Sequence, residues 1–241
     1  MQCIIYMFKI ILIYIKKTCN TFLIIKIIKK DYKNNFEKKL YFLEYISKFL
    51  WFIPNNYQKR YWYFADKNQK HDYTKYIHMS GSTNKFVNEI KNYSNSKDKL
   101  LDICCNVGRF LDDLNKGGFN DLYGFDINLK AINEMQKIFP NINHKKIKCA
   151  TAEEYLSSVD DNFFDITYTY GATIELIHPS FPLIKQISRI TKKYFICNIS
   201  ENGHAYPRFW RYEFKKNKFK IVKSTLSKDS ETTLFVLKKN S

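Results

Sequence analysis

The sequence predicts an α/β protein built on an open sheet that is mostly parallel, has an antiparallel last strand and carries helices on both faces. Short apolar runs alternate with helical patterns from residue 98 onward, which is typical of βαβ units. Two final apolar runs are joined by only a short polar loop, and so short a connection requires an antiparallel pair. The chain has 241 residues, 45% of them hydrophobic, and can therefore bury a substantial core.

The elements of this sheet follow one another along the chain after residue 98. We expect strands over 99–105, 122–127, 145–149, 162–170, 194–199, 219–223 and 232–237. We expect helices over 109–115, 129–139, 152–158, 181–191 and 207–216. Residues 98–241 are therefore predicted to form one domain, and residues 61–97 a helical lead-in to it.

The first 60 residues predict a basic, apolar helical extension. Residues 36–53 carry apolar side chains at helical spacing with lysines between them, and Pro54 follows. Two interpretations stay open: the segment packs over the rest of the chain or a partner, or residues 1–53 lie on an anionic membrane surface. Its apolar runs are shorter than the roughly 18 to 20 residues that span a bilayer. We expect a cytoplasmic protein, peripheral to the membrane at most.

Charge and cysteine usage restrict the partners. The formal net charge is +17, but the basic excess lies in residues 1–60 and 201–241, whereas residues 98–200 are almost neutral. Lysine far outnumbers arginine, the residue that nucleic-acid readers favour, so a nucleic-acid partner is disfavoured. The six cysteines form no CxxC pair and have no histidine nearby at zinc spacing, so we expect reduced thiols and no metal site.

The turn after the first strand is the candidate ligand site. Its sequence, DICCNVGR over residues 102–109, lies beyond the carboxyl end of that strand, where open α/β sheets bind ligands. Backbone N–H groups of a tight turn before a helix can approach a ligand closely. Asp126 ends the second strand and can accept hydrogen bonds from a ribose diol.

These residues resemble a known family. The stretch LLDICCNVGRFLDDL is similar to the first motif, roughly (D/E)xGxGxG, of class I S-adenosylmethionine-dependent methyltransferases. The resemblance continues through YGFDI, through Ala152-Glu153 and through DNFFDITYTYGATIELIHP, and covers about residues 98–200. It implies a Rossmann-like fold, with the antiparallel last strand of that family, and S-adenosylmethionine as cofactor.

The resemblance also implies roles for individual residues at the first turn. Asp102 would orient the turn and the amino-acid end of the cofactor, and Gly108 would permit close approach of the backbone. Cys104 and Asn106 stand where the family has its first two glycines. Asparagine tolerates left-handed backbone geometry and Cys104 is small, so we expect cofactor binding to survive.

The remaining implied cofactor contacts come from the next strands. Asp126 would hold the ribose hydroxyls and Ile127 would pack on the adenine. Ala152 and Glu153 would lie where the family binds the adenine amine, and Tyr170 would lie beside the reacting sulfonium.

Transfer of a methyl group to a hydroxyl or amine also needs a base. Glu175 and His178 stand three residues apart after the fourth strand and are predicted to converge on one pocket if that segment is helical. His204 follows the fifth strand and is a second candidate base, near Arg208, which could grip an anionic substrate.

The predicted function is methyl transfer to an oxygen or nitrogen of a small molecule, and similarity to related sequences suggests a sugar or glycan precursor. One alternative is a methyltransferase-like binding protein that has lost its chemistry, as the missing glycines suggest. The other is a nicotinamide-dependent oxidoreductase, although Cys104, Asn106 and Phe110 do not supply the GxGxxG pattern that such enzymes use. The sequence predicts no oligomeric state.

Overall fold

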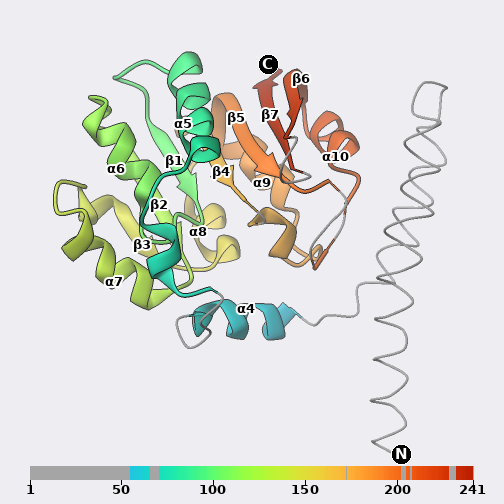
Figure 1. Ribbon diagram of the computed structural model, residues 1–241. Coiled ribbons are helices and arrows are strands. Elements are labelled where there is room, and N and C mark those ends of the chain that lie inside the picture. Colours follow the sequence, from blue (N-terminus) through green and yellow to red (C-terminus); the bar gives the residue numbers. More distant parts are fainter. Residues whose placement is uncertain are drawn as a thin grey trace, which may run out of the picture.

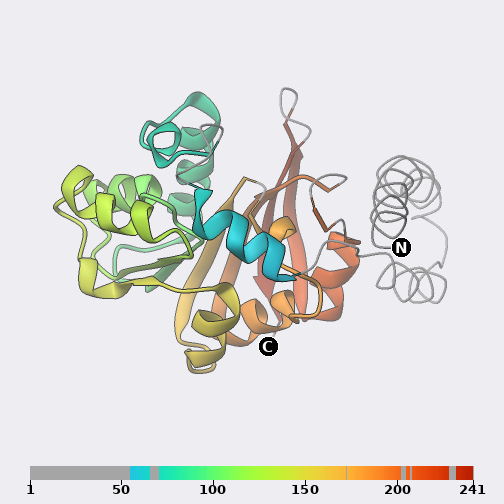
Figure 2. The same ribbon diagram turned by 90° about the horizontal axis from the view of Figure 1, so that it is seen from below.

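The computed structural model describes residues 55–65, 71–171, 173–201, 205–206, 208–227 and 232–240. These residues form a central sheet with helices on both faces (Figure 1 and Figure 2). The extension predicted over residues 1–53, with its helix at 36–53, lies outside the described residues.

The described residues contain a seven-stranded sheet in the order β3-β2-β1-β4-β5-β7-β6. Its strands are β1 (Leu100–Ile103), β2 (Leu122–Asp126), β3 (Ile147–Cys149), β4 (Phe164–Tyr170), β5 (Thr191–Ile199), β6 (Phe219–Leu226) and β7 (Thr233–Lys239). β1 to β5 are mutually parallel, and the order reverses between β1 and β4, where open α/β sheets open a crevice for ligands.

The last strand runs against its neighbours, as the sequence predicted. β7 lies between β5 and β6 and pairs antiparallel with both, with Cys197 opposite Phe235 in the first of these pairs. The short loop between β6 and β7 enforces the antiparallel pairing of these two strands, because a parallel return would need a long crossover.

Helices cover both faces of the sheet. They are α5 (Gly81–Tyr93), α6 (Arg109–Lys116), α7 (Leu129–Ile138), α8 (Ala152–Ser158), α9 (Leu183–Ile190) and α10 (Trp210–Lys216). α5, α6 and α7 pack on one face, where Phe86 and Met135 join Tyr168 of the sheet in one apolar cluster (Figure 2). α8, α9 and α10 pack on the other, where Ile187 and Trp210 join the sheet in a second cluster.

Several boundaries differ by a few residues from the sequence expectation, and those of β1, β5 and α10 are examples. β1 ends at Ile103, before 105, because Cys104 takes a left-handed backbone with φ +59°. β5 begins at Thr191, earlier than 194, and the buried Thr191 hydroxyl bonds both Ile187 O and Thr167 Oγ1 where α9 passes directly into the strand. α10 begins only at Trp210.

One further helix, α4 (Asn55–Tyr63), lies across the carboxyl-terminal edge of the sheet (Figure 1). It spans the boundary at residue 60 that the sequence suggested between extension and lead-in. No helix among the described ranges is both long and apolar enough to cross a membrane.

Candidate active site

A cavity of about 510 Å³ opens at the carboxyl ends of β1, β2 and β4. This is the edge at which an open α/β sheet binds its ligand, and the volume is within the range of small-molecule sites. One wall is the rim of the sheet and the facing wall is α4. Eight of the predicted cofactor residues line it: Asp102, Cys104, Asn106, Asp126, Ile127, Ala152, Glu153 and Tyr170.

The turn after β1 keeps the backbone geometry that glycines usually provide. Cys104, Asn106 and Gly108 all have positive φ, at 59°, 50° and 79°. The Asn106 side chain supports its own turn, because its Oδ1 accepts the Val107 N–H at 2.9 Å. Gly108 does not line the cavity: it precedes α6, and a Cβ there would lie 2.9 Å from Met135 Sδ. Position 108 therefore requires a glycine, both because its φ is positive and because a side chain would clash with Met135 of α7.

Asp126 is buried at the floor of the cavity, at the end of β2. Its Oδ2 accepts the Asn106 N–H at 2.9 Å, and its Oδ1 accepts the Asn128 N–H at 2.8 Å. Burial raises the pKa of Asp126, while these backbone N–H groups act to lower it. Each carboxylate oxygen has a second lone pair, so the group can still accept two hydrogen bonds from a ligand.

Asp102 and Arg109 face the same part of the cavity. Oδ2 of Asp102 is buried and accepts no hydrogen bond of good geometry within the part of the chain that the structure describes, although the buried Tyr168 hydroxyl lies close to this carboxylate. Burial and, to a smaller extent, the negative charge of Asp126 raise the pKa of Asp102 well above its usual range. The positive charge of Arg109 acts in the opposite direction. A cationic ligand group beside Asp102 would stabilise its ionised form.

Arg109 is held in place by aromatic rings and a backbone carbonyl. Its guanidinium lies 4.9 Å from the centroid of the Phe110 ring and 5.8 Å from that of Tyr170, and its Nη1 donates to His78 O at 3.2 Å. The Tyr170 hydroxyl in turn donates a hydrogen bond to Ser82 Oγ, with 3.0 Å between the two oxygens. These contacts fix a positive charge at the cavity wall.

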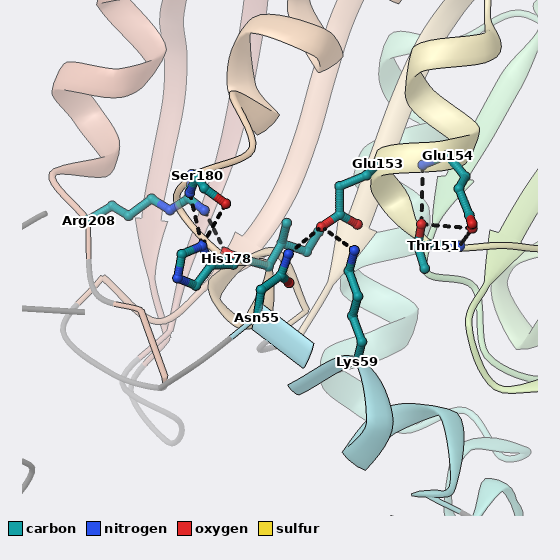
Figure 3. Close-up of polar contacts among 9 residues, drawn as sticks. Asn55, Lys59, Thr151, Glu153, Glu154, His178, Ser180 and Arg208 are labelled. Atoms are coloured by element: carbon teal, nitrogen blue, oxygen red, sulfur yellow. Dashed lines mark hydrogen bonds and ion pairs between the residues drawn. The ribbon is translucent and has the colours of Figure 1, made fainter. Parts of the chain in front are cut away.

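Glu153 lies at the opposite end of the cavity, in the first turn of α8. Thr151 caps this helix together with Glu154, which leaves the Glu153 side chain to face α4 (Figure 3). Glu153 Oε1 is 3.0 Å from Lys59 Nζ and accepts a hydrogen bond from Asn55 Nδ2 at 3.5 Å.

The two candidate catalytic residues after β4 are separated by the fold. His178 lines the cavity, and its Nδ1 accepts the Ser180 N–H at 3.1 Å (Figure 3). In the neutral imidazole this contact assigns the proton to Nε2. Glu175 lies in the short 3₁₀ helix η5 (Ile174–Leu176) and is completely buried, outside the cavity lining.

Glu175 therefore does not converge with His178, contrary to the sequence expectation. The segment is a short 3₁₀ turn, which directs Glu175 under the rim. Glu175 Oε1 accepts the Ser200 N–H at 2.7 Å, and its backbone oxygen accepts the Tyr206 N–H at 3.1 Å. Burial raises the pKa of Glu175 to about 8. The other candidate base, His204, lies outside the described residues.

Several residues that line the cavity were not among the site residues predicted from the sequence. They come from α4, from the segment before α5 and from the start of α6: Asn55, Gln58, Lys59, Tyr61, Trp62, His71, Tyr76 and Arg109. Arg109 follows Gly108 directly, so the resemblance already covered its position. The α4 residues are distant in sequence and lack an apolar stripe that would mark a packed helix.

Comparison with known proteins decides the family. A family described as "Methyltransferase domain" matches residues 60–217, more than half of the chain. The chain belongs to this family. No curated protein matches it in sequence.

Solved structures agree on the fold of this methyltransferase. Magnesium protoporphyrin IX methyltransferase from Synechocystis PCC 6803, solved with bound SAM, has a TM-score of 0.60 and 14% identity over 76% of this chain and 97% of that chain. A TehB-like SAM-dependent methyltransferase from Corynebacterium glutamicum has a TM-score of 0.55 and 17% identity over 77% of this chain and 97% of that one. The predicted class I, Rossmann-like fold and enzyme class are confirmed.

Family membership argues against one of the alternatives. The chain belongs to a methyltransferase family, so the nicotinamide-dependent oxidoreductase is not supported.

Proposed function

We propose that this methyltransferase moves a methyl group from S-adenosylmethionine to an oxygen or nitrogen of a small molecule, with a sugar or glycan precursor as the favoured class. The observation that carries the proposal is the pair of buried acids, Asp102 and Asp126, at the floor of one cavity. The donor contains a ribose diol and cationic groups, which are the chemical complements of these two carboxylates.

The residues fit this donor along the length of the cavity. Asp126 retains acceptor capacity for ribose hydroxyls, and the buried Oδ2 of Asp102 suits the amine of the amino-acid end. The fixed guanidinium of Arg109 would bind the carboxylate at that end. Ile127 and Ala152 would contact the adenine near Glu153.

The chain contributes mainly position to the reaction. When bound, S-adenosylmethionine would supply a methyl group activated by its sulfonium: the acceptor attacks the methyl carbon in line, the bond from that carbon to sulfur breaks, and S-adenosylhomocysteine leaves as a neutral thioether. Tyr170 shapes the cavity wall at the proposed reacting end, and α4 covers the cavity and limits access of water. His178 is the catalytic candidate that the structure brings to the cavity. Because Nδ1 accepts the Ser180 N–H, the Nε2–H of neutral His178 would donate a hydrogen bond to the acceptor and so position it, and His178 in this tautomer would not take the proton itself. Glu175 would act indirectly, as a positioning residue for Ser200.

The cavity lining supports a polar, ring-containing acceptor. Aromatic side chains from outside the sheet lie beside polar groups, and such rings present apolar faces with polar edges. They are Tyr61, Trp62, His71 and Tyr76. A sugar ring has the matching combination of polar hydroxyls and less polar faces.

Calorimetric titration of the full chain tests the donor. We expect one-to-one binding of S-adenosylmethionine and of S-adenosylhomocysteine, and no binding of NAD as the control dinucleotide. Lack of binding of both sulfur compounds would contradict the proposal. The acceptor class is tested by transfer of a labelled methyl group to matched panels of sugars, nucleotide sugars and amines, and labelling confined to non-sugar acceptors would exclude the glycan proposal.

We also propose peripheral membrane contact through residues 1–53. The support is their sequence, in which lysines alternate with apolar residues. Full-length protein should sediment with anionic vesicles more than with zwitterionic ones, and replacement of Lys16, Lys17 and Lys26 by glutamate should abolish the difference. Equal sedimentation of wild type and variant would favour packing on the chain or on a partner instead.

A further inference from the structure

α4 covers the cavity, and the face that it turns towards the cavity is largely polar among the residues described. One face of the helix lines the cavity through residues spaced by three and four positions: Asn55, Gln58, Lys59 and Trp62. The opposite face, at Asn56, Arg60 and Tyr63, is exposed. The inward face carries no aliphatic side chain, so a hydrophobic stripe does not attach this helix to the core.

Within the part of the chain that the structure describes, polar and aromatic contacts join α4 to its surroundings at both ends of the helix. Towards its beginning, Lys59 Nζ lies 3.0 Å from Glu153 Oε1, and Asn55 Nδ2 donates to the same oxygen (Figure 3). Towards its end, the Trp62 ring packs edge-on against His71, with 4.9 Å between ring centroids. The contacts at its beginning depend on charge, and they join α4 to the end of the cavity at which α8 begins.

We propose that Lys59 is a positioning residue that acts through Glu153: their ion pair latches α4 over the cavity and slows exchange of the cofactor. This inference rests on the proposed function. Glu153 lies on the wall where α8 begins and Lys59 on the wall formed by α4, so a ligand between these walls is enclosed while the pair is intact. Breaking the pair separates the two walls at that end.

The expected effect is modest. The side chains of Lys59 and Glu153 are 37% and 22% exposed, so water and salt weaken their attraction. Partly exposed ion pairs of this kind change an equilibrium about two- to five-fold. The latch therefore tunes the rate of opening and does not abolish it.

The experiment compares three full-length variants. Lys59→Met removes the charge, and Lys59→Arg preserves it. Lys137→Met is the matched control, because Lys137 forms an ion pair of similar length, 2.9 Å, with Glu134 on α7 and does not line the cavity. Two quantities are measured: the dissociation rate of S-adenosylhomocysteine, and amide hydrogen exchange within Asn55–Tyr63 in the absence of ligand.

Lys59→Met is expected to raise both the dissociation rate of S-adenosylhomocysteine and the rate of amide hydrogen exchange in α4 about two- to five-fold. Lys59→Arg and Lys137→Met should behave like wild type. Raising salt to about 0.5 M should bring wild type towards Lys59→Met while changing that variant little, because only wild type has the pair to screen.

Unchanged dissociation in Lys59→Met would overturn the latch. Faster dissociation of the ligand with unchanged amide hydrogen exchange in α4 would also overturn the latch, since Lys59 would then act on the ligand directly. If wild type binds no S-adenosylhomocysteine, the proposed function fails, and the exchange of α4 without ligand still shows whether Lys59 holds the helix.

Discussion

Two buried acids at the carboxyl edge of the sheet differ in what their oxygens face. Asp126 ends β2, lines the cavity and accepts a backbone N–H on each oxygen. Glu175 lies beyond β4, outside the cavity lining, and uses one oxygen to accept the Ser200 N–H. Its Oε2 has no partner among the residues described. Burial raises the pKa of both acids. A raised pKa therefore does not by itself distinguish a ligand-binding acid from one that supports the fold.

The largest expected effect is on cofactor affinity at Asp126. Asp126→Asn keeps the shape of the side chain but replaces one charged acceptor oxygen by an amide donor. Because hydrogen bonds to charged groups are strong, we expect S-adenosylmethionine to bind about 10- to 100-fold more weakly. Calorimetric titration measures this loss, with Glu175→Gln as the control, which should retain affinity. Equal affinity of Asp126→Asn and wild type would remove Asp126 from the cofactor site.

The difference between the two acids also explains how far the sequence could predict the site. Asp126 is the last residue of a strand, so the strand pattern and the edge rule together placed it correctly. Glu175 lies in a 3₁₀ turn whose direction has no simple periodic signal, and its spacing from His178 suggested a shared pocket that does not form.

The opposite wall of the cavity could not be predicted from local patterns. Asn55 and Glu153 contact each other although they are 98 residues apart in sequence. The α4 residues that line the cavity are polar or aromatic and resemble those of any exposed helix. By contrast, the left-handed backbone at Asn106 could be anticipated, because asparagine tolerates that conformation and the family resemblance marked the position.

A change at Glu175 should affect the stability of the fold and not the affinity for the cofactor. The pKa of Glu175 is raised from 4.5 to about 8, so between these values the folded chain binds a proton that the unfolded chain releases. Rising pH therefore favours unfolding across this range. Glu175→Gln removes this dependence, so its stability advantage over wild type should grow by about 1.4 kcal/mol for each pH unit between pH 5 and pH 8 and should be small near pH 5. Urea unfolding at several pH values measures it, and parallel pH profiles for the two proteins would show that Glu175 does not titrate in this way.

The smallest effect is expected at Asn106, whose backbone supports Asp126. Asn106→Gly preserves the N–H that donates to Asp126 Oδ2. It removes the backbone strain of a non-glycine residue at a φ of 50°, because glycine adopts positive φ freely. It also removes the Asn106 Oδ1 contact with Val107 N–H and gives the unfolded chain more freedom, so the opposing contributions nearly cancel. We expect the free energy of unfolding to change by less than about 1 kcal/mol and cofactor affinity to stay within about three-fold of wild type. A larger loss of affinity would mean that the asparagine side chain itself, and not only the backbone N–H beside it, contacts the ligand.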